Sequence, residues 1–129
     1  MKVLLIESDA CLRHKITNVL VKEGFTITSV ENGKKGLKLF KEHHFDLVIT
    51  DLIIQGINGM EVINSIRTKN KTIKIIAMSG GFHFLASDML QMAINAGANA
   101  IIPKPFSIAE LLINLNLLKS NPNRGMAIC

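Results

Sequence analysis

Tryptophan and tyrosine are both absent from this 129-residue chain, and six phenylalanines supply all of its aromatic side chains. Every apolar run falls short of the roughly 18 residues that a membrane-spanning helix needs. The opening run, Met1 to Glu7, is also too short for a signal peptide. Only Cys11 and Cys129 are present, which is no disulfide framework and has no metal-ligand spacing. We therefore expect a cytoplasmic protein with no disulfide bond and no membrane partner.

A nucleic-acid partner is suggested by the net charge of +5, but the sequence lacks the rest of such a site. Aromatic residues interleaved with basic ones are missing, and no segment has a recognisable base-reading face. The lysines in question are Lys34, Lys35, Lys38 and Lys41 in one expected helix, and Lys69, Lys71 and Lys74 around a loop. Lysines at this spacing are more typical of a solvated helix face, so we expect no nucleic-acid partner.

The composition, 48% hydrophobic and 19% charged, is typical of a folded globular chain, and its length fits one domain. Strands are expected at 3–6, 25–30, 47–49, 73–78 and 100–102, and helices follow each of them. Five alternations of strand and helix predict an α/β fold with a doubly wound parallel sheet. From Lys119 to the end we expect a flexible C-terminal tail.

Polar side chains stand where four of these strands end. Asp51 follows the apolar run 47–49, Glu7 follows the first strand, and Ser79 and Lys104 follow later strands. In open α/β sheets ligands bind in the crevice outside these carboxyl ends. Two acids, a hydroxyl and an amine suit a divalent cation and a phosphoryl group, and an aspartate can itself be the nucleophile. For Asp51 alone, the alternative is an aspartate that caps the nearby loop.

With these residues, positions 2–118 resemble a receiver domain of the two-component response regulators. The resemblance rests on Lys2–Ile6 followed by acid, on Asp51 with Gly56 and Gly59, on Ser79, and on Gly97-Ala98 leading to Lys104-Pro105-Phe106. It implies a flavodoxin-like fold, a five-stranded parallel sheet in the order 2-1-3-4-5 with five helices. With no output domain in the chain, it resembles the single-domain regulators that act by docking onto other proteins.

The resemblance also implies a role for each site residue. Asp51 would accept a phosphoryl group from a histidine kinase or phosphotransfer protein, Ser79 would be the switch hydroxyl, and Lys104 would pair with the phosphoryl group. Mg²⁺ would be held by Glu7, by Asp51 and by the backbone carbonyl of Ile53. No enzymatic activity beyond self-phosphorylation and self-dephosphorylation is implied.

Several positions depart from the family's usual pattern. Ser8 stands where the second acid usually touches the metal, so Ser8 is a doubtful ligand and Mg²⁺ binding is expected to be weaker than usual. Asp9 is expected to cap the following helix instead. Gln55 replaces a usual proline, and Ile101 replaces a usual aromatic residue. Ser8 and Ile101 favour the alternative of a phosphate-independent pseudo-receiver, an interaction module, whereas the intact phosphoryl site favours a phosphorylated switch.

The last expected helix, from Ser107 to about Leu118, is apolar along two lines. The second line, Ala109, Ile113 and Leu117, is expected to form a partner face for a downstream protein or a homodimer. The alternative is that this line packs under the previous helix.

Overall fold

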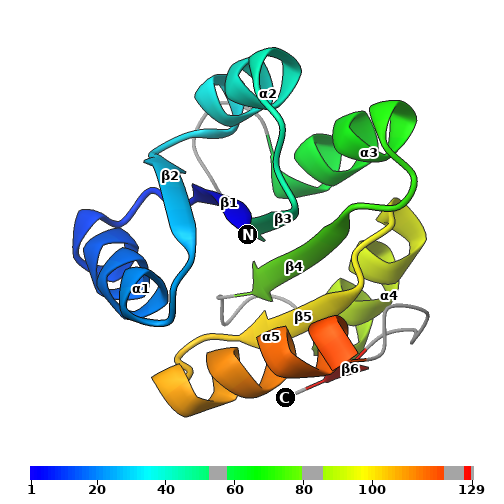
Figure 1. Cartoon of the computed structure of the whole chain (residues 1–129). Coiled ribbons are helices and arrows are strands. Elements are labelled where there is room, and N and C mark those ends of the chain that lie inside the picture. The colour runs from blue at the N-terminus through cyan, green and yellow to red at the C-terminus, as the bar shows by residue number, and fades with distance from the viewer. Residues whose placement is uncertain (53–57, 80–85, 121–126, 129) are drawn as a thin grey trace.

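Strands and helices alternate along the chain in the computed structural model, which describes residues 1–52, 58–79, 86–120 and 127–128. The strands are β1 (Lys2–Ile6), β2 (Thr26–Val30), β3 (Leu47–Asp51), β4 (Lys74–Ser79), β5 (Ala100–Pro103) and β6 (Ala127–Ile128). The helices are α1 (Ala10–Lys22), α2 (Gly33–Glu42), α3 (Gly59–Lys69), α4 (Ala86–Ala96) and α5 (Ile108–Ser120). The five expected strand–helix pairs are all present (Figure 1).

The strands form one parallel sheet in the order β2-β1-β3-β4-β5-β6, which confirms the predicted order 2-1-3-4-5. β2 lies at one edge, and three of its five residues are exposed polar side chains. The strongly apolar strands β1, β3 and β4 lie inside the sheet, where helices cover both faces.

The structure describes part of the C-terminal segment, for which a flexible tail from Lys119 stays a prediction. α5 extends to Ser120, and Ala127 and Ile128 form β6, which pairs in parallel with Ala100 and Ile101 of β5. A sheet edge carries unpaired backbone N–H and C=O groups, and pairing with a short strand satisfies some of them. Two residues are too few for a sequence pattern to indicate a strand.

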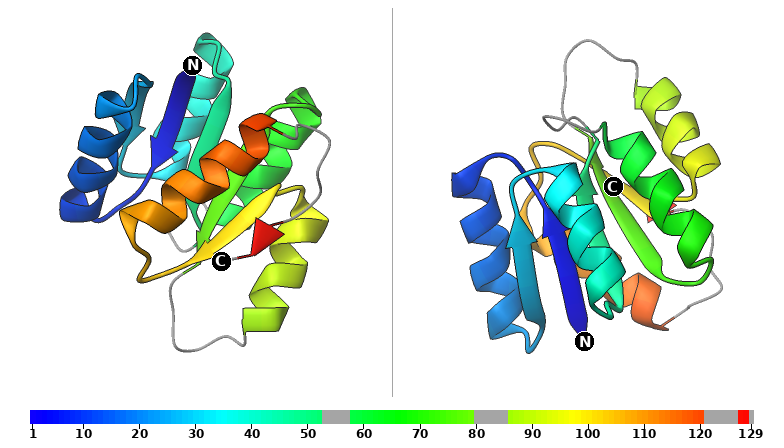
Figure 2. Two further views of the ribbon diagram at one scale, coloured as in Figure 1. Left: turned by 60° about the horizontal axis from the view of Figure 1, so that its bottom comes forward. Right: turned by 90° about the horizontal axis from the view of Figure 1, so that it is seen from above.

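Alternating side chains of the strands divide the core into two halves. Val3 and Leu5 of β1 pack with Ile16 of α1 and Leu111 of α5 on one face of the sheet. On the other face, Leu4 and Ile6 pack in a cluster that includes Val62 and Ile66 of α3 and Ala93 of α4. Helices α1 and α5 therefore cover one face, and α2, α3 and α4 cover the other (Figure 2).

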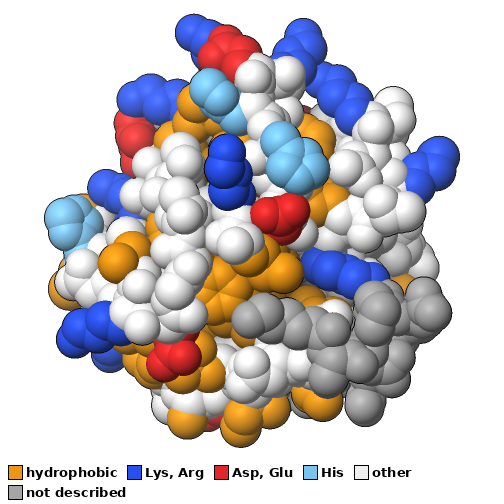
Figure 3. Space-filling view, viewed as in Figure 1, with side chains coloured by type: hydrophobic (Ala, Val, Ile, Leu, Met, Phe, Trp, Pro, Cys, Tyr) orange, Lys and Arg blue, Asp and Glu red, His pale blue; other side chains and the backbone are white. Residues whose placement is uncertain are grey.

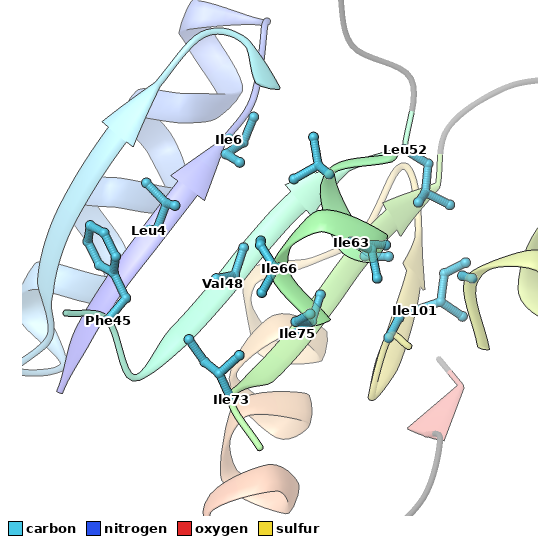
Figure 4. Close-up of a cluster of buried hydrophobic side chains, with 14 of the residues drawn as sticks. Leu4, Ile6, Phe45, Val48, Leu52, Ile63, Ile66, Ile73, Ile75 and Ile101 are labelled. Atoms are coloured by element: carbon cyan, nitrogen blue, oxygen red, sulfur yellow. The ribbon is translucent and has the colours of Figure 1, made fainter. Parts of the chain in front are cut away.

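Figure 4 shows the second of these halves. Its sticks come from the strands and from α3, and Leu4, Val48 and Ile75 lie on the three neighbouring strands β1, β3 and β4. Ile101, which stands where the family usually has an aromatic residue, is only 4% exposed and belongs to this cluster. At this position the chain therefore has a packed core side chain.

Helix α2 carries a solvated basic face, as the sequence predicted. Its four lysines, Lys34, Lys35, Lys38 and Lys41, are all exposed. Basic side chains stand along the top and upper right of the space-filling view, over α2 and α3 (Figure 3).

No helix in the described part of the chain is long and apolar enough to cross a membrane.

Short polar signals set the ends of several helices. Asn32 and Asn58 accept hydrogen bonds from the first turns of α2 and α3. The Ser107 hydroxyl accepts from the backbone N–H of Glu110 at 3.1 Å, as expected of a capping box. Gly97 follows α4 with a φ of 115°, a left-handed conformation that favours glycine.

Gly59, the first residue of α3, brings this helix against the end of β3. A Cβ atom there would lie 2.3 Å from the backbone oxygen of Asp51 and 2.5 Å from the Cα atom of Leu52. Both neighbours are backbone atoms, so a side chain at position 59 would force α3 and the end of β3 apart. The close approach therefore explains the glycine that the sequence pairs with Asp51.

We predict that Gly59→Ala lowers the free energy of unfolding by about 1 to 3 kcal/mol, because the contact cannot be relieved by a rotamer change. Urea denaturation followed by far-ultraviolet circular dichroism measures the loss. Gly24→Ala is the control, since Gly24 has a φ of 91° but nothing within 4 Å of its Cβ position, so only backbone strain of about 1 kcal/mol applies. Equal stability of Gly59→Ala and the native chain would contradict the steric account.

Candidate functional site

Two buried carboxylates lie side by side at the carboxyl edge of the sheet. Glu7 follows β1 directly, and Asp51 is the last residue of β3. β1 and β3 are neighbours, with Ile6 paired to Thr50, so the two acids leave adjacent strands at the same level. Glu7 is 1% exposed and Asp51 5% exposed. Two negative charges so placed repel each other and require a cation.

Lys104, which comes directly after β5, supplies that cation. Its Nζ atom donates to Glu7 Oε1 at 2.6 Å and to Asp51 Oδ2 at 2.7 Å, while its side chain is 22% exposed. Burial alone would lower the Lys104 pKa, but the hydrogen bonds and charges of Asp51 and Glu7 outweigh it and raise the pKa above its ordinary value. Lys104 therefore remains protonated at neutral pH and bridges both acids.

Ser79 reaches the same edge as the last residue of β4. Asp51 pairs with Met78 in the register of β3 and β4, so Ser79 lies one residue beyond the level of Asp51. The backbone N–H of Lys104 donates to the backbone oxygen of Ser79 at 2.6 Å. The structure thus brings Glu7, Asp51, Ser79 and Lys104 to one edge, with direct side-chain contacts among the acids and the lysine.

Ser8 and Asp9, which follow Glu7 after β1, have different roles. Ser8 is exposed. The Asp9 carboxylate accepts from the backbone N–H groups of Cys11 at 2.9 Å and Leu12 at 3.5 Å, so it caps α1 as expected. The backbone N–H of Asp9 donates to Glu7 Oε2 at 2.9 Å. Asp9 therefore orients Glu7 through its backbone while its own carboxylate stays with the helix.

Arg13 is a contributor that the sequence did not single out. Its Nη1 atom donates to the backbone oxygen of Glu7 at 2.7 Å and to that of Ser8 at 3.4 Å. A guanidinium from the first turns of α1 thus holds the segment that carries Glu7. No sequence motif predicts this contact, because it depends on how the segment after β1 folds back over α1.

The oxygen atoms at this edge suit Mg²⁺ in their chemistry but are few. Among the described residues, no three or more His, Cys, Asp or Glu side chains gather in a way that could hold a metal ion. Glu7 and Asp51 provide the hard, charged oxygens that Mg²⁺ prefers, and this ion usually keeps several waters. Ile53 lies outside the described residues, as do Gln55 and Gly56. The carboxylate pair fits the ion chemically, with most of its ligands left to water.

The sequence of this chain matches a known protein family. Residues 3–116 match the response regulator receiver domain. The chain belongs to this family. The expected receiver fold and its two-component signalling context are thereby confirmed.

Three similar proteins illustrate this relationship. The two-component response regulator PhoP of Pseudomonas aeruginosa is 30% identical over 118 residues, which cover 92% of this chain and 51% of PhoP. The response regulator TrrA of Thermotoga maritima, solved in complex with Mg²⁺ and BeF, is 33% identical with a TM-score of 0.78 and covers 91% of this chain and 97% of its own. A CheY-like receiver protein of Methanospirillum hungatei has the same fold at a TM-score of 0.86 and 21% identity, over 94% of both chains.

This receiver spans about half the length of several curated relatives. It covers 51% of PhoP and 46% of the transcriptional regulatory protein YcbL of Bacillus subtilis. The similarity therefore concerns the receiver domain, and it carries no information on what the remainder of those proteins does.

Removal of the bridging lysine should cost stability in a pH-dependent way. We predict that Lys104→Met lowers the free energy of unfolding at pH 7 by about 2 to 3 kcal/mol, less than for a fully buried pair. Folding raises the Lys104 pKa, so its stabilising contribution is complete below the unfolded value of about 10.4. That contribution is lost as the pH rises through the higher pKa of the folded state. The difference in free energy of unfolding between the native chain and Lys104→Met should therefore become smaller at strongly alkaline pH.

Urea denaturation at neutral and strongly alkaline pH measures this gap. Lys15→Met, at an exposed position of α1, is the control and should change stability little at either pH. The bridging role would be contradicted if Lys104→Met and the native chain had the same free energy of unfolding at neutral pH. It would also be contradicted if the difference between them grew as the pH rises.

Proposed function

We propose that this receiver is a phosphorylation switch, modified on Asp51 by a histidine kinase or phosphotransfer protein and acting in the cytoplasm through altered docking to other proteins. The supporting observation is the contact of 2.7 Å between Lys104 Nζ and Asp51 Oδ2 at the carboxyl edge of the sheet. A buried carboxylate with a lysine at its oxygen is suited to receive a phosphoryl group, because the lysine can neutralise the added charge.

The proposed transfer is a substitution at phosphorus. An Asp51 oxygen attacks, the bond between phosphorus and the donor's histidine nitrogen breaks, and that nitrogen keeps the electron pair, which gives an acyl phosphate. Lys104 balances charge on the transferred group, and the Ser79 hydroxyl donates a hydrogen bond to it. Hydrolysis of the acyl phosphate by water resets the switch, and no further enzymatic activity is proposed.

Mg²⁺ is proposed as the cofactor, supported by the carboxylates of Glu7 and Asp51 and by TrrA, which was solved with Mg²⁺ and BeF. It supplies positive charge against the phosphoryl oxygens. Glu7 is held ready by the backbone N–H of Asp9 and by the contacts of Arg13 to this segment. Because Ser8 contributes no charge, we propose weaker binding than in receivers with a second acid.

A phosphate-independent interaction module is the second candidate. It is favoured by Ser8 in place of an acid and by Ile101, a fixed core side chain where the family usually has an aromatic residue. Three intact residues, Asp51, Ser79 and Lys104, favour the switch, since an interaction module has no need of all of them.

The outer side of α5 is proposed as the partner face, for a downstream protein or a second copy. Ile113 is 56% exposed and Ala109 is exposed too, whereas Leu111, Leu115 and Leu118 are buried. The exposure of Ala109 and Ile113 supports this face over the alternative in which the second apolar line packs under α4, while Leu117 is half-buried. An exposed isoleucine on a helix with a separate buried face is typical of an interaction surface.

We predict that Asp51→Asn abolishes labelling by a small phosphodonor in the presence of Mg²⁺, because the amide keeps the shape of the side chain but is a poor nucleophile. Intact-protein mass spectrometry measures the gain of one phosphoryl group. Asp46→Asn, at a half-buried position outside the site, is the control and should label like the native chain. Equal labelling of Asp51→Asn would refute the assignment, and absence of labelling in the native chain would favour the interaction module.

We also predict that Ser8→Asp tightens Mg²⁺ binding by about tenfold and speeds labelling, because it adds a charged oxygen beside Glu7. Asp9→Ala should leave Mg²⁺ affinity nearly unchanged, since its carboxylate serves α1. Calorimetry or NMR is needed, because the chain has no tryptophan. If Asp9→Ala abolishes binding and Ser8→Asp has no effect, the assigned register of this segment is wrong.

A further inference from the structure

A groove of about 450 Å³ lies between α2 and α3, away from the phosphoryl site. It is lined by Leu37, Lys38 and Lys41 of α2 and by Ser65, Thr68 and Lys69 of α3. Leu37 and Ser65 are half-buried and form the floor, while the three lysines and Thr68 are exposed and form the rim. The groove is therefore a shallow, partly apolar floor inside a positively charged border.

Within the described part of the chain, no ion pair neutralises the charge of this border. None of the three rim lysines takes part in an ion pair within the described residues, whereas Lys35 of the same helix pairs with Glu31. The two helices carry four lysines in α2 and Arg67 and Lys69 in α3, against Glu42 and Glu61. Figure 3 shows the resulting basic side chains over α2 and α3.

The helix dipoles offset only part of the positive charge of the rim lysines. Lys41 and Lys69 lie in the last turns of α2 and α3, where cations interact favourably with the helix dipole. The dipole amounts to roughly half a negative charge per helix and is screened by solvent, so it leaves most of the lysine charge available. Lys38 lies one turn earlier and gains less from it.

The lining also indicates which anion fits. Among the described residues, no aromatic residue and no arginine line the groove, so this lining offers neither a stacking surface for bases nor the planar guanidinium that binds phosphate in two places. Lysines are flexible point charges that suit carboxylates spread along a chain. The Ser65 hydroxyl can donate to a carboxylate, and Leu37 offers contact to an aliphatic side chain.

We propose that the groove between α2 and α3 docks an acidic segment of a partner protein, with glutamate or aspartate side chains on the lysine rim and an aliphatic side chain against Leu37. The site is separate from Asp51, although α3 connects the two regions, since its first residue, Gly59, lies against Asp51 and its last, Lys69, lines the groove. The proposal does not rest on phosphorylation, and the unmodified chain suffices to test it.

The test is fluorescence anisotropy with a fluorescein-labelled peptide of repeated Glu-Glu-Leu triplets, and with a Gln-Gln-Leu peptide of the same length. The native chain should bind the acidic peptide, more weakly as salt is raised, and the neutral peptide at least roughly tenfold less tightly. Lys41→Glu combined with Lys69→Glu should weaken binding of the acidic peptide by at least roughly tenfold.

The matched control is Lys15→Glu combined with Lys22→Glu on α1, which changes the net charge equally at exposed positions. It should weaken binding less than about twofold, because only long-range attraction is altered. Circular dichroism verifies that both double variants are folded. Chemical shifts of the labelled protein should then change in α2 and α3 when the acidic peptide is added.

Several outcomes would overturn the proposal. One is absence of binding to the acidic peptide at millimolar concentration, and another is equal weakening by the groove variant and the α1 control. Tighter binding of a single-stranded oligonucleotide of the same charge, lost in the groove variant, would assign the groove to nucleic acid and so reject a protein partner. If the groove variant does not fold, Lys38→Gln combined with Lys69→Gln replaces it, with Lys15→Gln and Lys22→Gln as its control.

Discussion

The ion-pair cluster of Glu7, Lys104 and Asp51 is the constraint on which the arrangement of this receiver depends. Burying two carboxylates on adjacent strands costs free energy unless a cation lies between them. The cation comes from a third strand end, two places along the sheet from β3, and its backbone is fixed by a hydrogen bond to Ser79. In the strand order 2-1-3-4-5, the two acids leave adjacent strands, and the long Lys104 side chain reaches both of them from the end of β5.

The same cluster relates stability to the proposed chemistry. Lys104 stabilises the fold by neutralising two acids, and in the proposed switch it also balances the charge of a phosphoryl group on one of them. Addition of that group would change how Lys104 divides its contacts between Glu7 and Asp51. In the proposed switch, Lys104 would therefore link modification to conformation, because it contacts both strand ends.

Charge is distributed unevenly over the molecule, and α3 runs from the acidic edge of the sheet to the basic groove. Its N-terminus lies against the acidic edge through Gly59, where the backbone of Asp51 leaves no space for a side chain. Its C-terminus lines the basic groove with Lys69. A net charge of +5 is therefore not a uniform property of the surface, but combines a buried acidic pair with exposed lysines on α2 and α3.

The sequence by itself determined five of the strands, the five helices, several of their caps and the candidate site residues at the strand ends. These follow from local patterns: apolar runs such as Leu47–Ile49, alternation in β2, and side-chain oxygens at Asn58 and Ser107 that satisfy backbone N–H groups nearby. Parallel pairing then places all carboxyl ends at one edge, so Asp51, Ser79 and Lys104 could be grouped before any contact was known.

Only the tertiary structure decided which of these groups touch. That Lys104 bridges both acids, that Arg13 holds the backbone of Glu7, and that Ala127 and Ile128 extend the sheet depend on residues far apart in the sequence or on segments too short to carry a pattern. The lysine groove is a similar case, because periodicity indicates a solvated face of α2 but not that α3 supplies its other side. Such contacts depend on how closely the packed helices and strands approach one another, and local sequence patterns do not encode this approach.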